Sequence, residues 1–198
     1  SPYDVRTLKD ILALFPVEYI LLPDASDNLD GGYEENYSRL PDNGTTLEQI
    51  ALMAGSRLTI ELSLFCPSDD SPGEYLKENY GVPLVRISPP VGLRDTDAFI
   101  RLLSEISGVP VPEKLKKERS RYLDAMIDSH KYNAEGRAVV FGEPDFVYSM
   151  VRLCCENSLM PVVSATGTVS PGLKELLDDE IRKAALAIFN EEYTILDK

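Results

Sequence analysis

Cys66 is the residue whose type and position point most directly to chemistry. It follows the stretch 58–65, whose alternating pattern predicts a strand, and it precedes Pro67. Ligands of open parallel sheets bind beyond the carboxyl ends of strands, and a thiolate is the natural ligand of an iron–sulfur cluster. One cysteine cannot hold a cluster. Two interpretations of Cys66 therefore stay open, a cofactor-binding thiol and a small buried residue that closes a strand.

The other cysteines and the single histidine are weaker candidates for chemistry. Cys154 and Cys155 are adjacent on a predicted helix and point about 100° apart, so we interpret both as structural. His130 follows an amphipathic helix and has no nucleophile motif nearby, which favours a helix-end residue that interacts with carbonyls. Three cysteines in this pattern make neither a disulfide framework nor a self-contained zinc site. No catalytic residue is assigned.

Two loops past predicted strands could bind ligands. Asp24, Asp27 and Asp30 lie in an acidic, glycine-rich loop over 23–44, where they are either ligands of a hard cation or turn and cap residues. The turn 142–145 offers helix N-terminal amides to an anion, but it lacks the G-x-G-x-x-G pattern and brings two carboxylates, which disfavours a dinucleotide site. We expect ligands of this half of the chain near 142–145 and 164–170.

The stretch 136–168 predicts the architecture that positions these residues. Residues 138–141 form a short apolar run, Gly142 permits a turn, and Pro144 suits the first turn of a helix. Apolar residues then recur at helical spacing up to Cys154, before a second apolar run over 161–164. This βαβ pattern predicts an α/β fold of open parallel sheets with helices on both faces, Rossmann-like and repeated along the chain.

The remaining patterns predict a first α/β domain over 1–133 and the beginning of a second over 134–198. Thr45 and Glu48 have capping-box spacing, as do Ser71 and Glu74. A long helix over 112–132 is expected to bridge the two halves, and we expect the chain to begin and end within a larger fold. The other predicted elements are helices over 4–15, 47–54, 72–80, 97–107 and 173–187 and strands over 18–22, 58–65 and 84–87.

Composition limits the class of protein. The formal net charge of −13 over 198 residues disfavours nucleic acids and anionic membranes as partners. No apolar run approaches the roughly 20 residues that a membrane span needs, and the first residues do not resemble a signal peptide. We expect a cytoplasmic protein without a nucleic-acid or membrane partner.

Several segments, in order and in register, resemble the nitrogenase component 1 family. They are LLPDASDNLDGGY over 21–33, NGTTLEQI over 43–50, the whole of 80–132, and VVFGEPDFVYSMVRL over 139–153, where the family turn usually reads G-D-P-D. The similarity is strongest to the β-subunit-like branch, which includes the molybdenum-iron protein β subunit and cofactor-assembly scaffold subunits. Asp128 and His130 match the family's D-S-H, which we interpret as a structural helix end.

The resemblance implies a fragment of a longer oxidoreductase subunit with three similar α/β domains. The intact protein would accept electrons from an ATP-dependent iron–sulfur reductase, pair with a homologous or identical component 1 subunit, and carry iron–sulfur clusters or a related metallocluster. No cofactor is expected in this fragment, which alone would be inactive. The alternatives are a non-catalytic scaffold for metallocofactor assembly and a small-molecule binding module without clusters.

The resemblance also bears on Cys66. The α-type subunits of the family place a cofactor-ligating cysteine after the strand that corresponds to 58–65, and Cys66 falls at or within a residue of that position. The surrounding motifs are β-like, however, and β subunits do not use this position as a ligand. Cys66 is therefore a candidate cofactor ligand, and the metal is unknown.

Overall fold

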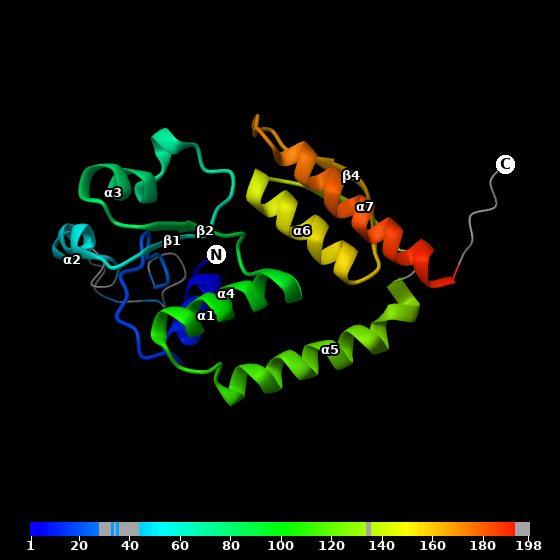
Figure 1. The fold of residues 1–198 in the computed structure, drawn as a ribbon, viewed down its shortest axis with the longest axis horizontal. Coiled ribbons are helices and arrows are strands. Elements are labelled where there is room, and N and C mark those ends of the chain that lie inside the picture. The colour runs from blue at the N-terminus through cyan, green and yellow to red at the C-terminus, as the bar shows by residue number, and fades with distance from the viewer. Residues whose placement is uncertain (28–32, 34, 36–43, 134–135, 193–198) are drawn as a thin grey trace.

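A computed structural model describes residues 1–27, 33, 35, 44–133 and 136–192, with side chains described up to residue 184. Within these residues, helices surround two separate pairs of parallel strands (Figure 1). The elements in chain order are α1 (Pro2–Leu12), α2 (Leu47–Leu52), the 3-10 turn η1 (Met53–Gly55), β1 (Thr59–Glu61), the 3-10 turn η2 (Ser68–Asp70), α3 (Pro72–Tyr80), β2 (Leu84–Arg86), α4 (Gly92–Ser107), α5 (Glu113–Asn133), β3 (Arg137–Phe141), α6 (Pro144–Glu156), β4 (Met160–Ala165) and α7 (Leu173–Glu192).

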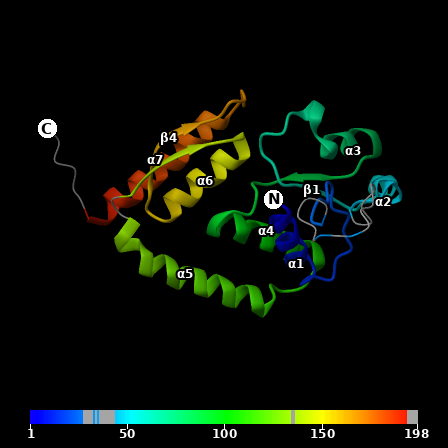
Figure 2. The same ribbon diagram turned by 180° about the vertical axis from the view of Figure 1, so that it is seen from behind.

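The first pair of strands forms a βαβ unit with helices on both faces. β1 and β2 run parallel, α3 connects them, and α1 and α4 lie on the side opposite α3 (Figures 1 and 2). α3 begins where the Ser71 hydroxyl accepts a hydrogen bond from the Glu74 amide at 3.0 Å, and it ends at Gly81, whose φ of 71° is left-handed. The main core under this sheet joins Phe15 from the end of α1 to Phe99 and other buried apolar residues of α4. The predicted α/β class is confirmed.

The second pair of strands forms another βαβ unit, but among the described residues the predicted cover of helices on both faces is missing here: Val139 and Phe141 of β3, which alternate with the buried Val140, are 63% and 75% exposed. β3 and β4 are parallel and α6 connects them, as the sequence predicts. Val147 and Val151 of α6 are fully buried against Val140 of β3, and Cys154 completes this cluster. α7 packs on α6, with Leu177 and other apolar side chains at the edge of the same cluster (Figure 1).

The long helix predicted over 112–132 is present as α5, and it runs along one side of the molecule from the first sheet toward the second (Figure 1). None of its residues is buried. Leu115 packs against the first core, and polar side chains add further contacts: Nε of Arg119 lies 2.8 Å from Asp97 of α4, and Nδ1 of His130 lies 3.0 Å from the Ser158 hydroxyl. The domain boundary at 133 and 134 stays a prediction. No helix in the described ranges is long and apolar enough to cross a membrane.

The amino end of α4 meets α6 and α7 in a network of charges. Glu156 of α6 accepts hydrogen bonds from the Leu93 amide at 2.7 Å and the Arg94 amide at 3.0 Å, so its carboxylate caps a helix far away in the sequence. The Arg94 guanidinium lies 2.9 Å from Glu156 and 2.8 Å from Glu180 of α7. One arginine therefore ties three helices together.

A second ion pair lies beside this cap. Nη1 of Arg152 in α6 is 2.7 Å from Oδ1 of Asp95 in α4, and the side chains are only 16% and 6% exposed. The Ser88 hydroxyl donates to the other oxygen of Asp95 at 3.3 Å. Burial raises the pKa of Asp95, and the positive charge of Arg152 opposes that effect. Breaking such a buried pair leaves an uncompensated charge, so the pair strongly disfavours separation of the helices.

Two predicted elements in the first part of the chain were wrong in detail. Residues 18–22 form no strand, because this stretch pairs with no strand among the described residues; the Leu21 carbonyl instead accepts a hydrogen bond from the Thr45 hydroxyl. That contact takes Thr45 out of the predicted capping box. The box forms one residue later, where the Thr46 hydroxyl accepts from the Gln49 amide at 3.2 Å and the Gln49 side-chain oxygen accepts from the Thr46 amide at 2.9 Å. Both registers fit the S/T-x-x-E/Q pattern.

The predicted start of the next helix was also wrong. We expected a helix from residue 97 with a cap at Asp95 or Thr96, but α4 begins at Gly92. Its first residues can be helical because Glu156 satisfies their amides from another element, which no local pattern announces.

Phe99 tests the core under the first sheet. Its side chain is 2% exposed, so Phe99→Ala should lower the free energy of unfolding by about 3–5 kcal/mol, through lost burial and the cavity left behind. Ile127→Ala is the control, because Ile127 is 75% exposed and should change stability by less than about 0.5 kcal/mol. Urea unfolding followed by circular dichroism measures both. Equal effects of the two substitutions would contradict this description of the core.

Candidate functional site

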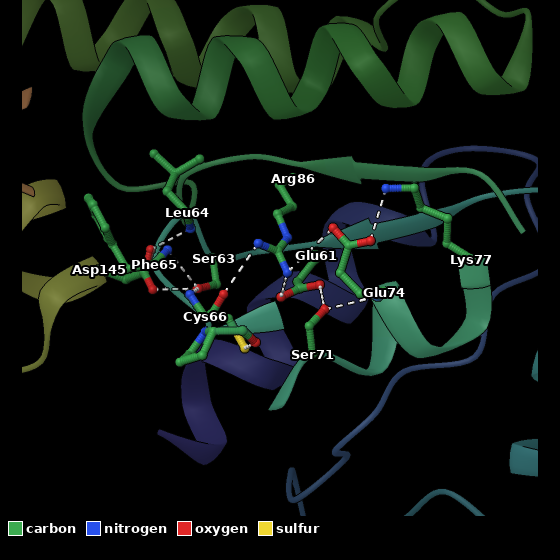
Figure 3. Close-up of polar contacts among 11 residues, drawn as sticks. Glu61, Ser63, Leu64, Phe65, Cys66, Ser71, Glu74, Lys77, Arg86 and Asp145 are labelled. Carbon is green, nitrogen blue, oxygen red and sulfur yellow. Dashed lines mark hydrogen bonds and ion pairs between the residues drawn. The ribbon is translucent and has the colours of Figure 1, made fainter. Parts of the chain in front are cut away.

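The candidate site lies where β1 ends and α6 begins. Residues 63–66, here named the Cys66 loop, follow the carboxyl end of β1 and face Asp145 in the first turn of α6 (Figure 3). β1 is shorter than the strand predicted over 58–65, because the amides of Leu64, Phe65 and Cys66 are bound by side chains and not by a neighbouring strand. The Cys66 loop therefore stands beyond the sheet, at the edge where open parallel sheets bind ligands.

Asp145 holds the Cys66 loop from the second α/β unit. Its Oδ2 accepts a hydrogen bond from the Ser63 hydroxyl at 2.5 Å, and its Oδ1 accepts from the Leu64 amide at 2.7 Å. The Ser63 oxygen in turn accepts from the Cys66 amide at 2.9 Å and, less closely, from the Phe65 amide at 3.3 Å. A single carboxylate thus fixes three amides of the loop, two of them through the Ser63 hydroxyl.

Two further contacts complete the support of the loop. The Phe65 ring meets the Tyr148 ring of α6 edge to face, with centroids 5.8 Å apart and planes at 78°. On the other side, Nη1 of Arg86 in β2 donates to the Cys66 carbonyl at 3.2 Å (Figure 3). The backbone of Cys66 is therefore bound at its amide through α6 and at its carbonyl through β2.

Arg86 sits at the centre of an acidic cluster. Its Nη2 lies 3.6 Å from Glu61 and 3.9 Å from Glu74, and the Ser71 hydroxyl donates to the other oxygen of Glu61 at 2.6 Å (Figure 3). Nε and Nη2 of Arg86 and Oε1 of Glu61 are buried without a hydrogen-bond partner. The pairing is thus electrostatic and not a close bidentate fit.

The Cys66 thiol is partly buried. Its Sγ lies 3.7 Å from the Pro67 carbonyl oxygen, in hydrogen-bond range for sulfur. Burial raises the pKa of the Cys66 thiol, and Glu61 raises it further through hydrogen bonding and negative charge, against a smaller opposing effect of Arg86. Both effects favour the protonated thiol over the thiolate, which is the form that attacks electrophiles and binds metals.

A metal cluster needs more ligands than this site offers. In the described part of the chain, no three histidine, cysteine, aspartate or glutamate side chains gather as they would around a metal ion. A thiol that binds metal must lose its proton, whereas Cys66 holds its proton more tightly than an ordinary cysteine. The residues present do not fit an iron–sulfur cluster by themselves. Cys66 as a cofactor ligand stays a prediction.

The other residues singled out in the sequence lie apart from the Cys66 loop. Cys154 is buried in the core of the second sheet and Cys155 is partly buried beside it, and burial raises the pKa of both thiols. His130 stands near the end of α5, as predicted, but its Nδ1 pairs with the Ser158 hydroxyl and not with a carbonyl.

Asp24 acts as a turn residue. It accepts from the amide and the hydroxyl of Ser26 at 3.1 and 2.7 Å, and its other oxygen lies 2.5 Å from Nζ of Lys9. These contacts support the turn interpretation of the acidic loop, because they occupy the carboxylate. Asp30, the third aspartate of the predicted cation site, lies outside the described residues.

The second predicted ligand region, 164–170, borders a cavity. A cavity of about 400 Å³ lies between β4 and α7, with Ser164, Thr166 and Ser170 among its lining residues. At the first predicted region, the Asp145 carboxylate is bound by the Cys66 loop. A larger cavity of about 570 Å³ separates α4 from α5, and both apolar side chains such as Ile100 and Leu115 and charged ones such as Asp97 and Arg119 line it.

Sequence reasoning missed the residues that build the site. Asp145 was counted only as a negative charge against an anion site, and Ser63, Glu61 and Arg86 were not singled out. One signal was present, because a carboxylate in the first turn of a helix can accept from the amides of a neighbouring loop as well as from its own helix. The contact with Ser63 and Leu64 joins positions more than 80 residues apart, and no local pattern could supply that pairing.

The pH dependence of Cys66 alkylation tests the surroundings of its thiol. Only the thiolate reacts, so the rate of modification by iodoacetamide should rise with pH through a midpoint above the ordinary value of a cysteine. Glu61→Gln removes the negative charge and should lower the midpoint, whereas Glu78→Gln, an exposed position on α3, should not. Mass spectrometry of the peptide that contains Cys66 separates it from the other two cysteines. An ordinary midpoint that Glu61→Gln leaves unchanged would contradict the assignment.

Comparisons with known proteins place this geometry in a family. Residues 1–197 match the family described as Nitrogenase component 1 type Oxidoreductase. The chain is 32% identical to the nitrogenase molybdenum-iron protein beta chain of Clostridium pasteurianum over 88% of its own length and 37% of the relative's. It is also 32% identical to the nitrogenase iron-molybdenum cofactor biosynthesis protein NifN of Nostoc sp. strain PCC 7120, over 89% of this chain and 39% of that protein.

The fold agrees with the sequence matches. A solved structure titled Nitrogenase Cp1 at pH 6.5 superposes on 93% of this chain and 40% of its own, with a TM-score of 0.87 and 30% sequence identity. The chain therefore spans about two fifths of the length of the relatives it matches. With a family match along almost its entire length and the same fold, the chain belongs to the nitrogenase component 1 family.

Proposed function

We propose that this chain is part of a β-chain-like subunit of a nitrogenase component 1-type oxidoreductase, in which electrons pass through metal clusters to a substrate. The observation that carries the proposal is the continuous match to the molybdenum-iron protein beta chain over 88% of the chain at 32% identity. The similarity includes the residues that form β1, the Cys66 loop and α6, so it extends through the candidate site.

In this proposal the described residues have a structural role and position other parts of the subunit. The donor set around Cys66 does not fit a cluster alone, so the iron–sulfur or related clusters would be held mainly by residues beyond those described here. Iron–sulfur chemistry depends on cluster potential and on the hydrogen bonds and burial around the cluster. Ion pairs between the helices, one of them the buried pair of Arg152 and Asp95, suit that positioning role, because they limit movement between the elements.

The proposal includes two partners and a compartment. The subunit would pair with a homologous or identical component 1 subunit and receive electrons from an ATP-dependent iron–sulfur reductase. The designation of several relatives as beta chains supports the first partner. All three cysteines are free thiols, which supports a reducing, cytoplasmic location.

A scaffold for metallocofactor assembly is the second candidate, because the match to the cofactor biosynthesis protein NifN is as high in identity and coverage as the match to the beta chain. The two functions differ in what happens to electrons. An oxidoreductase consumes electrons in repeated turnovers, whereas a scaffold holds a cluster and transfers it to another protein.

Electron consumption by the complete protein tests the proposal. The complete subunit, purified anaerobically with its partner subunit, should consume dithionite continuously for many equivalents per chain when the ATP-dependent reductase and ATP are supplied. Omitting ATP is the control and should stop consumption. Uptake of no more than a few equivalents, together with transfer of bound iron to a recipient protein, would instead identify a scaffold.

The same preparation tests Cys66. If Cys66 is a ligand, Cys66→Ala should lower iron and acid-labile sulfide per chain, while Cys155→Ala, the matched control, should not. Equal metal content in both variants and the unaltered protein would make Cys66 a packing residue.

A further inference from the structure

Cys66 and Asp145 belong to different α/β units, yet the position of one depends on the other. The Cys66 loop follows β1 in the first unit, and Asp145 opens α6 in the second (Figure 3). From the direction of their hydrogen bonds, we infer that Asp145 is a positioning residue that holds the Cys66 thiol in its shielded place across the boundary between the two units. The inference does not depend on metal binding by Cys66.

The Asp145 carboxylate accepts two hydrogen bonds from the Cys66 loop. Asp145 accepts from the Ser63 hydroxyl at 2.5 Å and the Leu64 amide at 2.7 Å. Hydrogen bonds to a charged acceptor are about twice as strong as those between neutral groups. Because the Ser63 hydroxyl points its proton at Asp145, its oxygen is free to accept from the Cys66 amide at 2.9 Å.

On the amide side, Cys66 is held through the Ser63 hydroxyl and not by a neighbouring strand. The amides of 64–66 donate to these side chains, and none of them takes part in the β1–β2 ladder. Arg86 binds the carbonyl of Cys66, but it belongs to the same unit as the loop. Without Asp145, the loop would therefore keep its hydrogen bond to Arg86 of its own sheet and lose its hydrogen bonds to α6.

α6, which carries Asp145, is itself fixed against the first unit. Tyr148, one turn after Asp145, packs against the Phe65 ring, and the Arg152 guanidinium lies 5.4 Å from the Tyr148 centroid. Arg152 is also paired with Asp95 of α4. The residues that face the loop thus lie on a helix whose other contacts fix it to the first unit. Movement of α6 away from α4 should release the Cys66 loop as well.

The rate at which a small alkylating reagent modifies Cys66 measures this restraint. In Asp145→Ala, loss of the charged acceptor should raise the rate of iodoacetamide modification at Cys66 by about tenfold or more at fixed pH. Ser63→Ala should have a similar effect, and the double variant should add less than about twofold, because both substitutions remove the same link. Ser63→Thr keeps the hydroxyl and should restore a rate close to that of the unaltered protein.

Two controls separate positioning from general loss of stability. Glu143→Ala removes a carboxylate from the same end of α6. That carboxylate accepts a hydrogen bond from the Thr168 hydroxyl and not from the Cys66 loop, so Cys66 should react as before. Cys154 is buried in the core of the second unit and reports global opening within the same sample. Equal acceleration at Cys154 and Cys66, or no acceleration at Cys66 in Asp145→Ala and Ser63→Ala, would overturn the inference.

Discussion

The carboxylate of Glu156 is the contact on which the relation between the two sheets depends. It binds the two free amides at the start of α4 and the side chain of Arg94, which also reaches Glu180. The side chain of Glu156 is only 7% exposed, so its charge is little screened by water. Replacing it would remove the acceptor of two helix-terminal amides and one of the two carboxylates that Arg94 binds, which is costlier than loss of a surface ion pair.

The close approach at this contact is also built into the backbone. Gly92, the first residue of α4, has a φ of 75° and lies so near Glu156 that an added Cβ would stand 2.5 Å from one of its oxygens. A side chain at this position would have to displace the carboxylate that caps the helix. Gly92 thus combines a left-handed turn with the space that Glu156 needs.

The parts of the fold that depend on neighbours in sequence could be predicted, and the parts that depend on distant residues could not. Ser71 with Pro72 and the turn before Pro144 marked helices that are present, and apolar spacing revealed the β3–α6–β4 unit. The start of α4 was misplaced because its cap comes from Glu156. The candidate site was only half found for the same reason: Cys66 could be identified from its place after a strand, whereas its support by Asp145 requires the folded chain.

Family membership and local chemistry give complementary information about function. The family is one of oxidoreductases, but the matched region is about two fifths of a typical relative. Within the described residues, burial and Glu61 raise the pKa of the Cys66 thiol, which works against the thiolate that metal binding requires. This combination suits a supporting part of a subunit better than a complete redox centre.

Amide hydrogen exchange in Glu156→Ala is the most direct test of the central claim, that the charged contact at α4 sets the position of α6 against the Cys66 loop. The claim predicts that the Leu64 amide, which is bound by Asp145, exchanges about tenfold faster together with the amides of Leu93 and Arg94, while Glu118→Ala, which alters an exposed ion pair on α5, changes none of them. Faster exchange at Leu93 and Arg94 with no change at Leu64 would contradict it, because the two contacts would then act independently.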